Sequence, residues 1–455
     1  MIASAHTGGQ YSLFRALFGT YLAIHFLHLL PWGTEVFSHA GVFADGDASP
    51  LFGIFPNLFL LSDSPAMVSL ALVAGALASI LLAVGKFDRA AAVFLWLLWA
   101  SLLGRNPLIS NPGIPFVGWL LLAHALLPSA PFGSLAAVGR TDPKGTWTMP
   151  PSILTAAWLV LALGYTYSGY TKLISPSWVD GSAFGYLLAN PLARDTPLRG
   201  FALSMPELLL QLATWSVLAM ELLYAPLALF PRARKWIWLI MVSMHLGLVV
   251  LVDFADLTIG MLMMHLFVFD PAWIPSKLGL KKSEGTAQGD GEEPDVLFYD
   301  GSCGLCHRTT RLLLAEDSSG EKFRFAPLDS DTFRVAFQGR EALPDSLVLL
   351  RPDGRHFTRT SAVVLLLERL GGLWRLVALG LRLIPRPMRD AGYDAIARIR
   401  LALAALDGAA RHFFFARWAA WFAACFSTLD QESRRETARL KTGAPGFEST
   451  VSTVK

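Results

Sequence analysis

The sequence predicts a polytopic α-helical membrane bundle of about eight spans, followed by a small α/β domain and C-terminal helices. Of the 455 residues, 53% are hydrophobic and only 16% are charged. A soluble chain carries about a quarter charged residues, so this composition predicts a membrane protein. After residue 294 the pattern changes to short strand and helix signals, which predict the α/β domain.

Hydrophobic segments long enough to cross a bilayer follow one another through the first 270 residues. The N-terminus shows no signal-peptide cleavage pattern, so we expect the first segment to remain as a helix. The third, fourth, seventh and eighth segments are short, so a second possibility is that one pair of them forms a re-entrant hairpin and does not cross the bilayer. We place the spans at residues 11–30, 66–84, 88–104, 113–128, 150–171, 207–230, 236–252 and 254–270.

Basic residues predict the orientation, because Lys and Arg collect in cytoplasmic connections. They fall on alternate connections, and both termini are therefore expected in the cytoplasm, with the chain in a bacterial inner membrane. The loop at residues 172–206 is an exception, since it carries three basic residues on the opposite side. The net charge of +3 is small and its bases are dispersed, so we expect the lipid bilayer and no nucleic acid as a partner.

Composition also divides the chain into domains. We assign residues 1–275 to the membrane bundle, 276–294 to a polar linker and 295–402 to the α/β domain. Strands are expected at 296–299, 323–327, 346–350 and 355–358, and helices at 304–316, 361–370 and 373–383. Residues 403–432 are expected to form an amphipathic helix that lies on the membrane or packs on the preceding domain. Residues 433–455 are polar and expected to be disordered.

Two cysteines at the start of the α/β domain carry the clearest chemistry. Cys303 and Cys306 follow a short buried strand and the turn residues Asp300 and Gly301, and they open a helix. Free N–H groups and the helix dipole favour a thiolate at that place. Cys303 would attack a disulfide and Cys306 would resolve the mixed disulfide, which is dithiol chemistry.

Three other interpretations of the pair remain open. A structural zinc site needs four ligands, and the sequence offers only one further cysteine, Cys425, and the neighbouring His307. The run from Cys303 to His307 also matches the c-type haem attachment pattern. Two incidental core cysteines are the third interpretation. We predict no metal site.

The run from Tyr299 to Cys306 resembles the opening motif of the DCC thiol-disulfide oxidoreductase family, also known as DUF393. The resemblance continues through residues 323–328, 346–350, 353–354, 359–362 and 384–390 and ends near Arg398. It implies a thioredoxin-like fold with Cys303 and Cys306 as the redox pair.

Ionisable residues inside the predicted spans form a second set of candidates, because such residues are costly in a bilayer and usually functional. Glu221 is a lone carboxylate and needs a partner. His245 and His265 lie on the next two spans, so a buried Glu–His cluster is expected to relay protons or bind a cofactor. Single histidines, including those at positions 25, 28 and 124, are as readily explained as hydrogen-bonded core residues.

Lys172 follows three tyrosines (165, 167 and 170) that are expected to anchor a span at the membrane interface. A lysine there either snorkels to the surface or, partly desolvated, acts as a base. With Trp178, Gly181 and the upstream Arg105-Asn-Pro, the stretch resembles the HTTM family over residues 10–275. That family includes the vitamin K-dependent gamma-carboxylase, and the resemblance implies that Lys172 is a catalytic base near a quinone-like or lipidic cofactor.

The sequence thus supports three hypotheses of function. The first is a membrane-bound thiol-disulfide oxidoreductase that exchanges electrons with an unidentified thiol or disulfide protein or small molecule through its CxxC pair. The second is an enzyme of the membrane domain with Lys172 as its base. The third is a non-enzymatic membrane binding or immunity protein whose intramembrane polar residues are structural.

Overall fold

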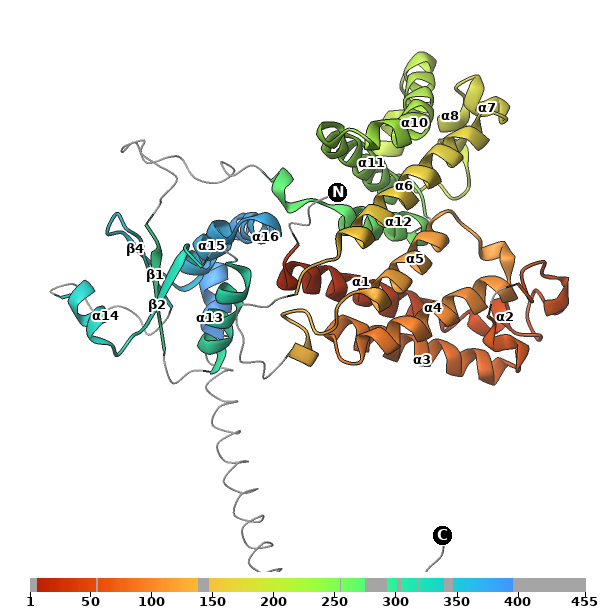
Figure 1. Cartoon of the computed structure of the whole chain (residues 1–455). Helices are drawn as coiled ribbons and strands as arrows, with labels where there is room; N and C mark the ends of the chain where they lie inside the picture. Colours follow the sequence, from red (N-terminus) through yellow and green to blue (C-terminus); the bar gives the residue numbers. More distant parts are fainter. Residues whose placement is uncertain are drawn as a thin grey trace, which may run out of the picture. The chain divides into compact units, whose positions relative to one another are not determined.

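The computed structural model describes residues 6–54, 56–137, 147–253, 255–274, 293–300, 304–317, 320–338 and 347–395. The chain divides into two compact units, Met1–Leu383 and Ile384–Lys455. The first contains the helical bundle and a small sheet (Figure 1). In the second, residues 386–395 are helical. The predictions for residues 396–455, including the amphipathic helix and the tail, lie outside the described residues, as does most of the linker.

Helices stand at all eight positions where the sequence predicts spans. They are α1 (Gly8–Leu29), α3 (Pro65–Val84), α4 (Asp88–Arg105), α5 (Gly113–Leu126), α6 (Pro151–Lys172), α10 (Glu207–Ala228), α11 (Pro231–Leu251) and α12 (Ala255–Val268). Within the described residues, four of these helices are long and apolar enough to cross a membrane, namely α3, α6, α10 and α11. The count of about eight spans therefore stays a prediction.

Helix α3 shows how local sequence sets the bounds of one candidate span. The side chain of Ser64 caps its first turn, and Gly85 ends it in the left-handed region at φ +71°. The last turn of a helix leaves carbonyl groups without intrahelical donors. The buried guanidinium of Arg15 from α1 donates to two of them, the carbonyls of Leu82 at 2.7 Å and Ala83 at 2.9 Å. Arg15 thus supplies hydrogen-bond donors to the C-terminal end of α3.

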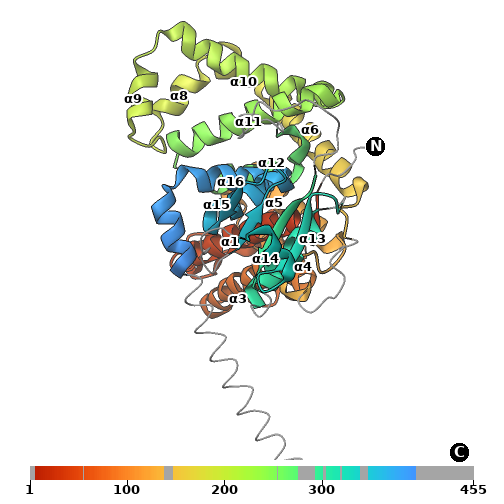
Figure 2. The same cartoon turned by 90° about the vertical axis from the view of Figure 1, so that its left-hand side faces the viewer.

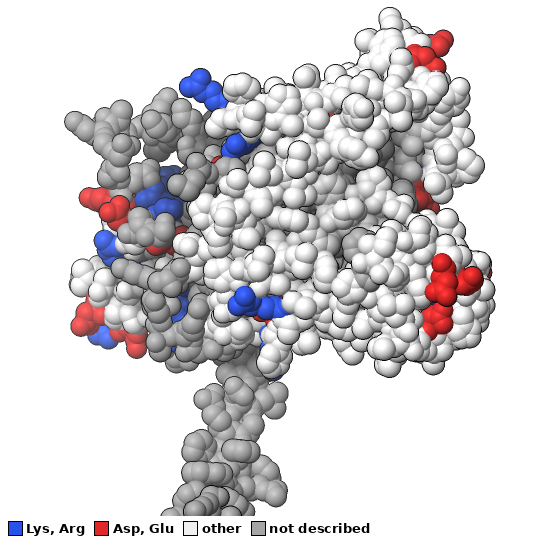
Figure 3. All heavy atoms as spheres, turned by 45° about the vertical axis from the view of Figure 1, so that its right-hand side comes forward, with Lys and Arg blue, Asp and Glu red and all other residues white. Residues whose placement is uncertain are grey.

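The outer surface of the bundle is apolar. Large aliphatic side chains such as Ile24, Leu70 and Leu163 are more than 60% exposed on α1, α3 and α6. One face of the molecule carries few Lys, Arg, Asp or Glu side chains over a broad area (Figure 3). An apolar surface of this extent on a soluble monomer would be unusual, and it fits helices that contact lipid.

Short helices fill the connections of the bundle. The segment from 172 to 206, which the sequence predicts only as a loop, contains three of them beside α10 and α11 (Figure 2). Its basic residues, which break the predicted charge pattern, have local partners. Arg194 pairs with Asp253 at 3.0 Å, and Arg199 donates to the carbonyl of Leu188 at 2.8 Å. The short helices are α2 (Gly33–Phe37), α7 (Pro176–Val179), α8 (Ala183–Ala189) and α9 (Pro197–Leu203), with 3₁₀ turns at Gly46–Ala48, Leu58–Leu60, Pro107–Ile109, Leu135–Ala137 and Pro271–Trp273.

The α/β region is built on a mixed four-stranded sheet with the order β2-β1-β3-β4. Strand β1 is parallel to β2 and antiparallel to β3, and β3 is antiparallel to β4. The elements are β1 (Asp295–Tyr299), α13 (Gly304–Glu316), β2 (Phe323–Pro327), α14 (Asp331–Ala336), β3 (Val348–Leu350), β4 (His356–Thr358), α15 (Arg359–Leu370) and α16 (Gly372–Leu383). All four predicted strands and three predicted helices are present, whereas α14 was not predicted.

Candidate functional sites

The first candidate site follows the central strand of the sheet. Strand β1 is paired on both sides, and its end is fixed by the N–H of Leu328, which donates to the carbonyl of Tyr299 at 2.8 Å. Helix α13 begins at Gly304, five residues after Tyr299, and its Leu313 is buried in a hydrophobic cluster with residues of the sheet. The chain thus leaves a central strand and enters a helix where the two cysteines stand.

The backbone places Cys306 in the first turn of α13. Its side chain and the whole of Cys303 lie outside the described residues, so the prediction that their sulfurs form a pair is not tested by geometry. A helix N-terminus supplies the N–H groups and the positive dipole end that stabilise a thiolate. The strand-to-helix junction expected from the sequence is therefore present.

At the opposite end of β1, a buried carboxylate faces two arginines. Burial raises the pKa of Asp295 to about 6, and the nearby guanidinium of Arg351 opposes that rise. The Asp295 carboxylate lies 3.8 Å from Arg351 Nε and 3.6 Å from Arg369 Nε. These groups stand at the amino end of β1, whereas the cysteines follow its carboxyl end, so we interpret them as structural.

The second candidate site is a partly open cavity of about 730 Å³ among the helices of the bundle. Helices α5, α6, α10, α11 and α12 form its walls, and the short helices α7 and α8 add to them. Ligand pockets commonly have volumes of 300–1,000 Å³. Most of the lining is apolar, and its ionisable side chains include Tyr165, Lys172, Glu221 and His245.

Lys172 and Glu221 form an ion pair at the cavity wall. Lys172 Nζ lies 2.5 Å from Glu221 Oε2, and it donates to Ser168 Oγ at 2.9 Å. The ammonium also lies 4.7 Å from the centroid of the Trp178 ring, which adds a cation–π contact. The side chains are 20% and 6% exposed. The partner that Glu221 was expected to need is therefore Lys172.

Two histidines meet on one tyrosine. Tyr165 Oη lies 2.7 Å from Nε2 of His245 and 2.7 Å from Nε2 of His265. Because one hydroxyl has one proton, it donates to one ring and accepts from the other. The predicted Glu–His cluster is thus two groups, an ion pair and a His–Tyr–His row. His245 lines the cavity, and His265 contacts both Tyr165 and the His245 ring.

The interpretation of Tyr165 as an interface anchor was wrong. Its side chain is only 5% exposed, whereas Tyr167 and Tyr170 are 68% and 64% exposed and remain suited to that role. Helical spacing could have identified it, because Tyr165, Ser168 and Lys172 recur at intervals of three and four residues and so share one helix face.

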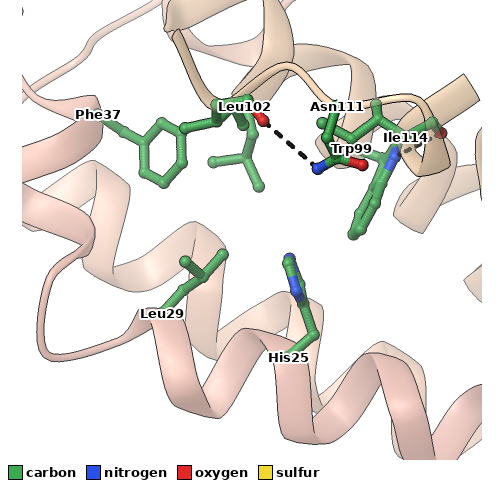
Figure 4. A pocket seen from close by; sticks show the side chains of 8 residues that line it. His25, Leu29, Phe37, Trp99, Leu102, Asn111 and Ile114 are labelled. Carbon is green, nitrogen blue, oxygen red and sulfur yellow. Dashed lines mark hydrogen bonds between the residues drawn. The ribbon is translucent and has the colours of Figure 1, made fainter. Parts of the chain in front are cut away.

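The other intramembrane candidates lie away from this cavity. His124 contacts Tyr11 Oη through Nδ1 at 2.5 Å and lies 3.4 Å from Asp88, in a buried structural row. Arg105 is fully buried and pairs with Asp63 at 3.0 Å. His25 lines a separate cavity of only about 80 Å³ between Trp99 and other side chains (Figure 4).

Among the described residues, no group of three or more His, Cys, Asp or Glu side chains is arranged to hold a metal ion. The ion pair and the His–Tyr–His row can bind hydrogen-bonding groups or move protons. Neither group can itself take up electrons.

Comparison with known proteins identifies the α/β region. Residues 297–406 match the family of DCC1-like thiol-disulfide oxidoreductases. The chain is also similar to the Uncharacterized protein YuxK of Bacillus subtilis (strain 168), with 33% identity over 109 residues that make up 23% of this chain and 77% of YuxK. No solved structure matches. The family match begins at residue 297, so the HTTM resemblance of the membrane region stays a prediction. Through its C-terminal region, the chain belongs to the DCC1-like thiol-disulfide oxidoreductase family.

Proposed function

We propose that the protein is a membrane-bound thiol-disulfide oxidoreductase that uses Cys303 and Cys306 as its redox pair. The observation that carries this proposal is the position of the CxxC sequence. Along the sequence, this CxxC motif lies between the end of central strand β1 and the first turn of helix α13, in the region that belongs to the oxidoreductase family. The mixed sheet with β1 in its interior also supports a thioredoxin-like domain.

The reaction proceeds by two thiolate attacks. The Cys303 thiolate attacks a substrate disulfide, forms a mixed disulfide and releases the first substrate thiolate, which takes up a proton. The Cys306 thiolate then attacks Sγ of Cys303 and releases the second substrate thiol. The substrate disulfide gains two electrons, and the cysteine pair becomes a disulfide. An external thiol must then reduce the pair for another cycle.

The membrane helices locate this chemistry. The four long apolar helices, supported by the four other helices at predicted spans, anchor the chain in a bilayer. With eight spans and the charge pattern of the connections, both termini and the dithiol lie in the cytoplasm of a bacterial cell. Because the cytoplasm keeps thiols reduced, reduction of a disulfide or redox sensing fits this placement better than oxidative folding.

Cysteine variants of the full chain test this proposal. With a disulfide peptide as substrate, Cys303→Ser should abolish reduction, and Cys306→Ser should accumulate a mixed disulfide detectable by mass spectrometry. Cys425→Ser is the matched control and should retain activity. Labelling of Cys303 by an impermeant thiol reagent in inverted vesicles, but not in intact cells, is expected from the proposed orientation. Full activity in Cys303→Ser would refute the redox assignment.

The cavity favours a second candidate function in the membrane domain. Here Lys172 would act as a base toward a quinone-like or lipidic cofactor, with Glu221, His245 and His265 as supporting groups. The observation in favour is that Lys172 stands at the wall of a ligand-sized cavity. If Lys172→Arg and Lys172→Met both preserve the cellular phenotype, this candidate fails. If Cys303→Ser preserves the phenotype too, the non-enzymatic hypothesis is favoured.

A further inference from the structure

We propose that the cavity binds an uncharged amphiphile, with one long apolar tail and a small head that carries a hydroxyl or carbonyl group. This proposal rests on the second candidate function and names the ligand class of that site. It follows from three features of the cavity: its apolar lining, its balance of charge and an unpartnered polar atom.

The apolar lining suits a hydrocarbon tail. The volume of about 730 Å³ is bounded largely by aliphatic, aromatic and thioether side chains. They come from five of the helices at predicted spans, α5, α6, α10, α11 and α12. A tail placed there exchanges one apolar environment for another and loses no hydration. Representative lining residues are Phe116, Val217, Met244, Leu248, Leu251 and Met261.

The charge balance excludes a charged head group. The lining contains one ammonium, that of Lys172, and one carboxylate, that of Glu221, and these lie 2.5 Å apart. The pair therefore has no net charge that could balance a charged head group. The other ionisable side chains of the lining are Tyr165, Tyr186 and His245, which have uncharged forms. An anionic or cationic head would therefore lie unpaired in an apolar surrounding, which is costly.

An incomplete hydrogen-bond row stands in the cavity wall. His245 lines the cavity and is 4% exposed, and its Nδ1 has no hydrogen-bond partner among the described residues. Its Nε2 is occupied by Tyr165. Buried polar atoms without partners destabilise a protein. A hydroxyl that both donates and accepts can pair with His245 in either tautomer, whereas a carbonyl pairs only with the Nδ1–H form.

Three probes with the same chain and different heads test the proposal. A photoreactive diazirine analogue of oleyl alcohol is crosslinked to the full-length protein in lipid nanodiscs, and labelled peptides are mapped by mass spectrometry. Unlabelled oleyl alcohol, oleic acid and oleylamine then compete at pH 8. We expect labelling on α6, α10 or α11 and competition by the alcohol at about tenfold lower concentration than by either charged probe. Equal or better competition by oleic acid or oleylamine would overturn the proposal.

Two variants separate charge from shape. Glu221→Gln leaves the Lys172 ammonium unbalanced, so oleic acid should gain about tenfold relative to the alcohol. Gly247 lines the cavity, and a Cβ added there meets no atom within 4 Å. Gly247→Phe should fill the cavity and abolish labelling, whereas Leu246→Phe, at a neighbouring position that is 53% exposed, should not. An unchanged head preference in Glu221→Gln, or full labelling of Gly247→Phe, would also overturn it.

The binding experiment can fail or succeed independently of the proposed functions. Thiol-disulfide exchange by Cys303 is measured without any of these probes. Alcohol-selective labelling of a Lys172→Arg variant that also keeps the cellular phenotype would contradict catalysis by Lys172 and still support the ligand class.

Discussion

Replacement of Lys172 by methionine gives a direct test of the structure inside the bundle. Methionine keeps most of the side-chain length and removes only the ammonium. The Glu221 carboxylate, 6% exposed, then lies in the cavity wall without its cation. Breaking a buried ion pair by removal of one partner is far more destabilising than replacing both partners, because it leaves an uncompensated charge.

The size of the loss can be bounded from the pair itself. Unit charges 2.5 Å apart attract by about 7 kcal/mol at an effective dielectric constant of about 20, which is an upper limit before desolvation is subtracted. Removal of one partner from a buried ion pair typically costs about 3–5 kcal/mol. We therefore expect a loss of about 3–5 kcal/mol at pH 7.

Unfolding in mixed detergent micelles, followed by tryptophan fluorescence, measures this stability deficit.

A double variant completes this test. Lys172→Met with Glu221→Gln removes both charges and should lie closer in stability to the original protein than Lys172→Met does. A Lys172→Met variant as stable as the original protein, or a double variant that is less stable than Lys172→Met, would refute the ion pair as the cause.

Three further predictions concern other parts of the fold. Tyr165→Phe removes the hydroxyl between two histidines and should cost about 1–3 kcal/mol in the same unfolding assay, while the exposed Tyr167→Phe should cost almost nothing. The raised pKa of Asp295, about 6, means that its stabilising contribution is present below about pH 4 and lost as pH rises through 6. Relative to Asp295→Asn, the protection of β1 amides against hydrogen exchange should therefore fall over that range, by on the order of 2–3 kcal/mol. A Cβ on Gly19 would lie 2.5 Å from the backbone N of Ala83, so Gly19→Leu should separate α1 from α3 and cost at least about 1–3 kcal/mol of unfolding free energy.

Hydrophobic pattern and turn residues predicted the elements well. Strand β1 lies where a short apolar run placed it, and helix α13 lies where a helical pattern placed it, because apolar pattern and local turn chemistry act over a few residues. The short helices between α6 and α10 escaped prediction. They have too few residues to show a period, and contacts such as that of Phe184 N–H with Thr214 Oγ1 at 3.1 Å fix them.

The residues of the candidate site in the bundle could be predicted from the sequence, but the contacts between them could not. Glu221, His245 and His265 were singled out because each ionisable side chain in a span is costly. Which of them meet depends on how α6, α10, α11 and α12 rotate against each other. The sequence contains no local signal for that rotation. Helical spacing places Tyr165 on one face with Ser168 and Lys172, but the partners of its hydroxyl, two histidines 80 and 100 residues away, depend on the same rotation.

The distribution of cysteine limits how the two parts of the chain can cooperate. All three cysteines stand at position 303 or later, so residues 1–275 contain none. Thiol-disulfide exchange requires a sulfur at each step, and it therefore cannot continue into the membrane region within this chain. The groups that line the cavity can bind polar head groups or move protons, but they carry no electrons. Cooperation of the dithiol with the cavity thus requires a separate molecule that is soluble in lipid and reacts with thiols. The charge balance at Lys172 and Glu221 favours an uncharged one.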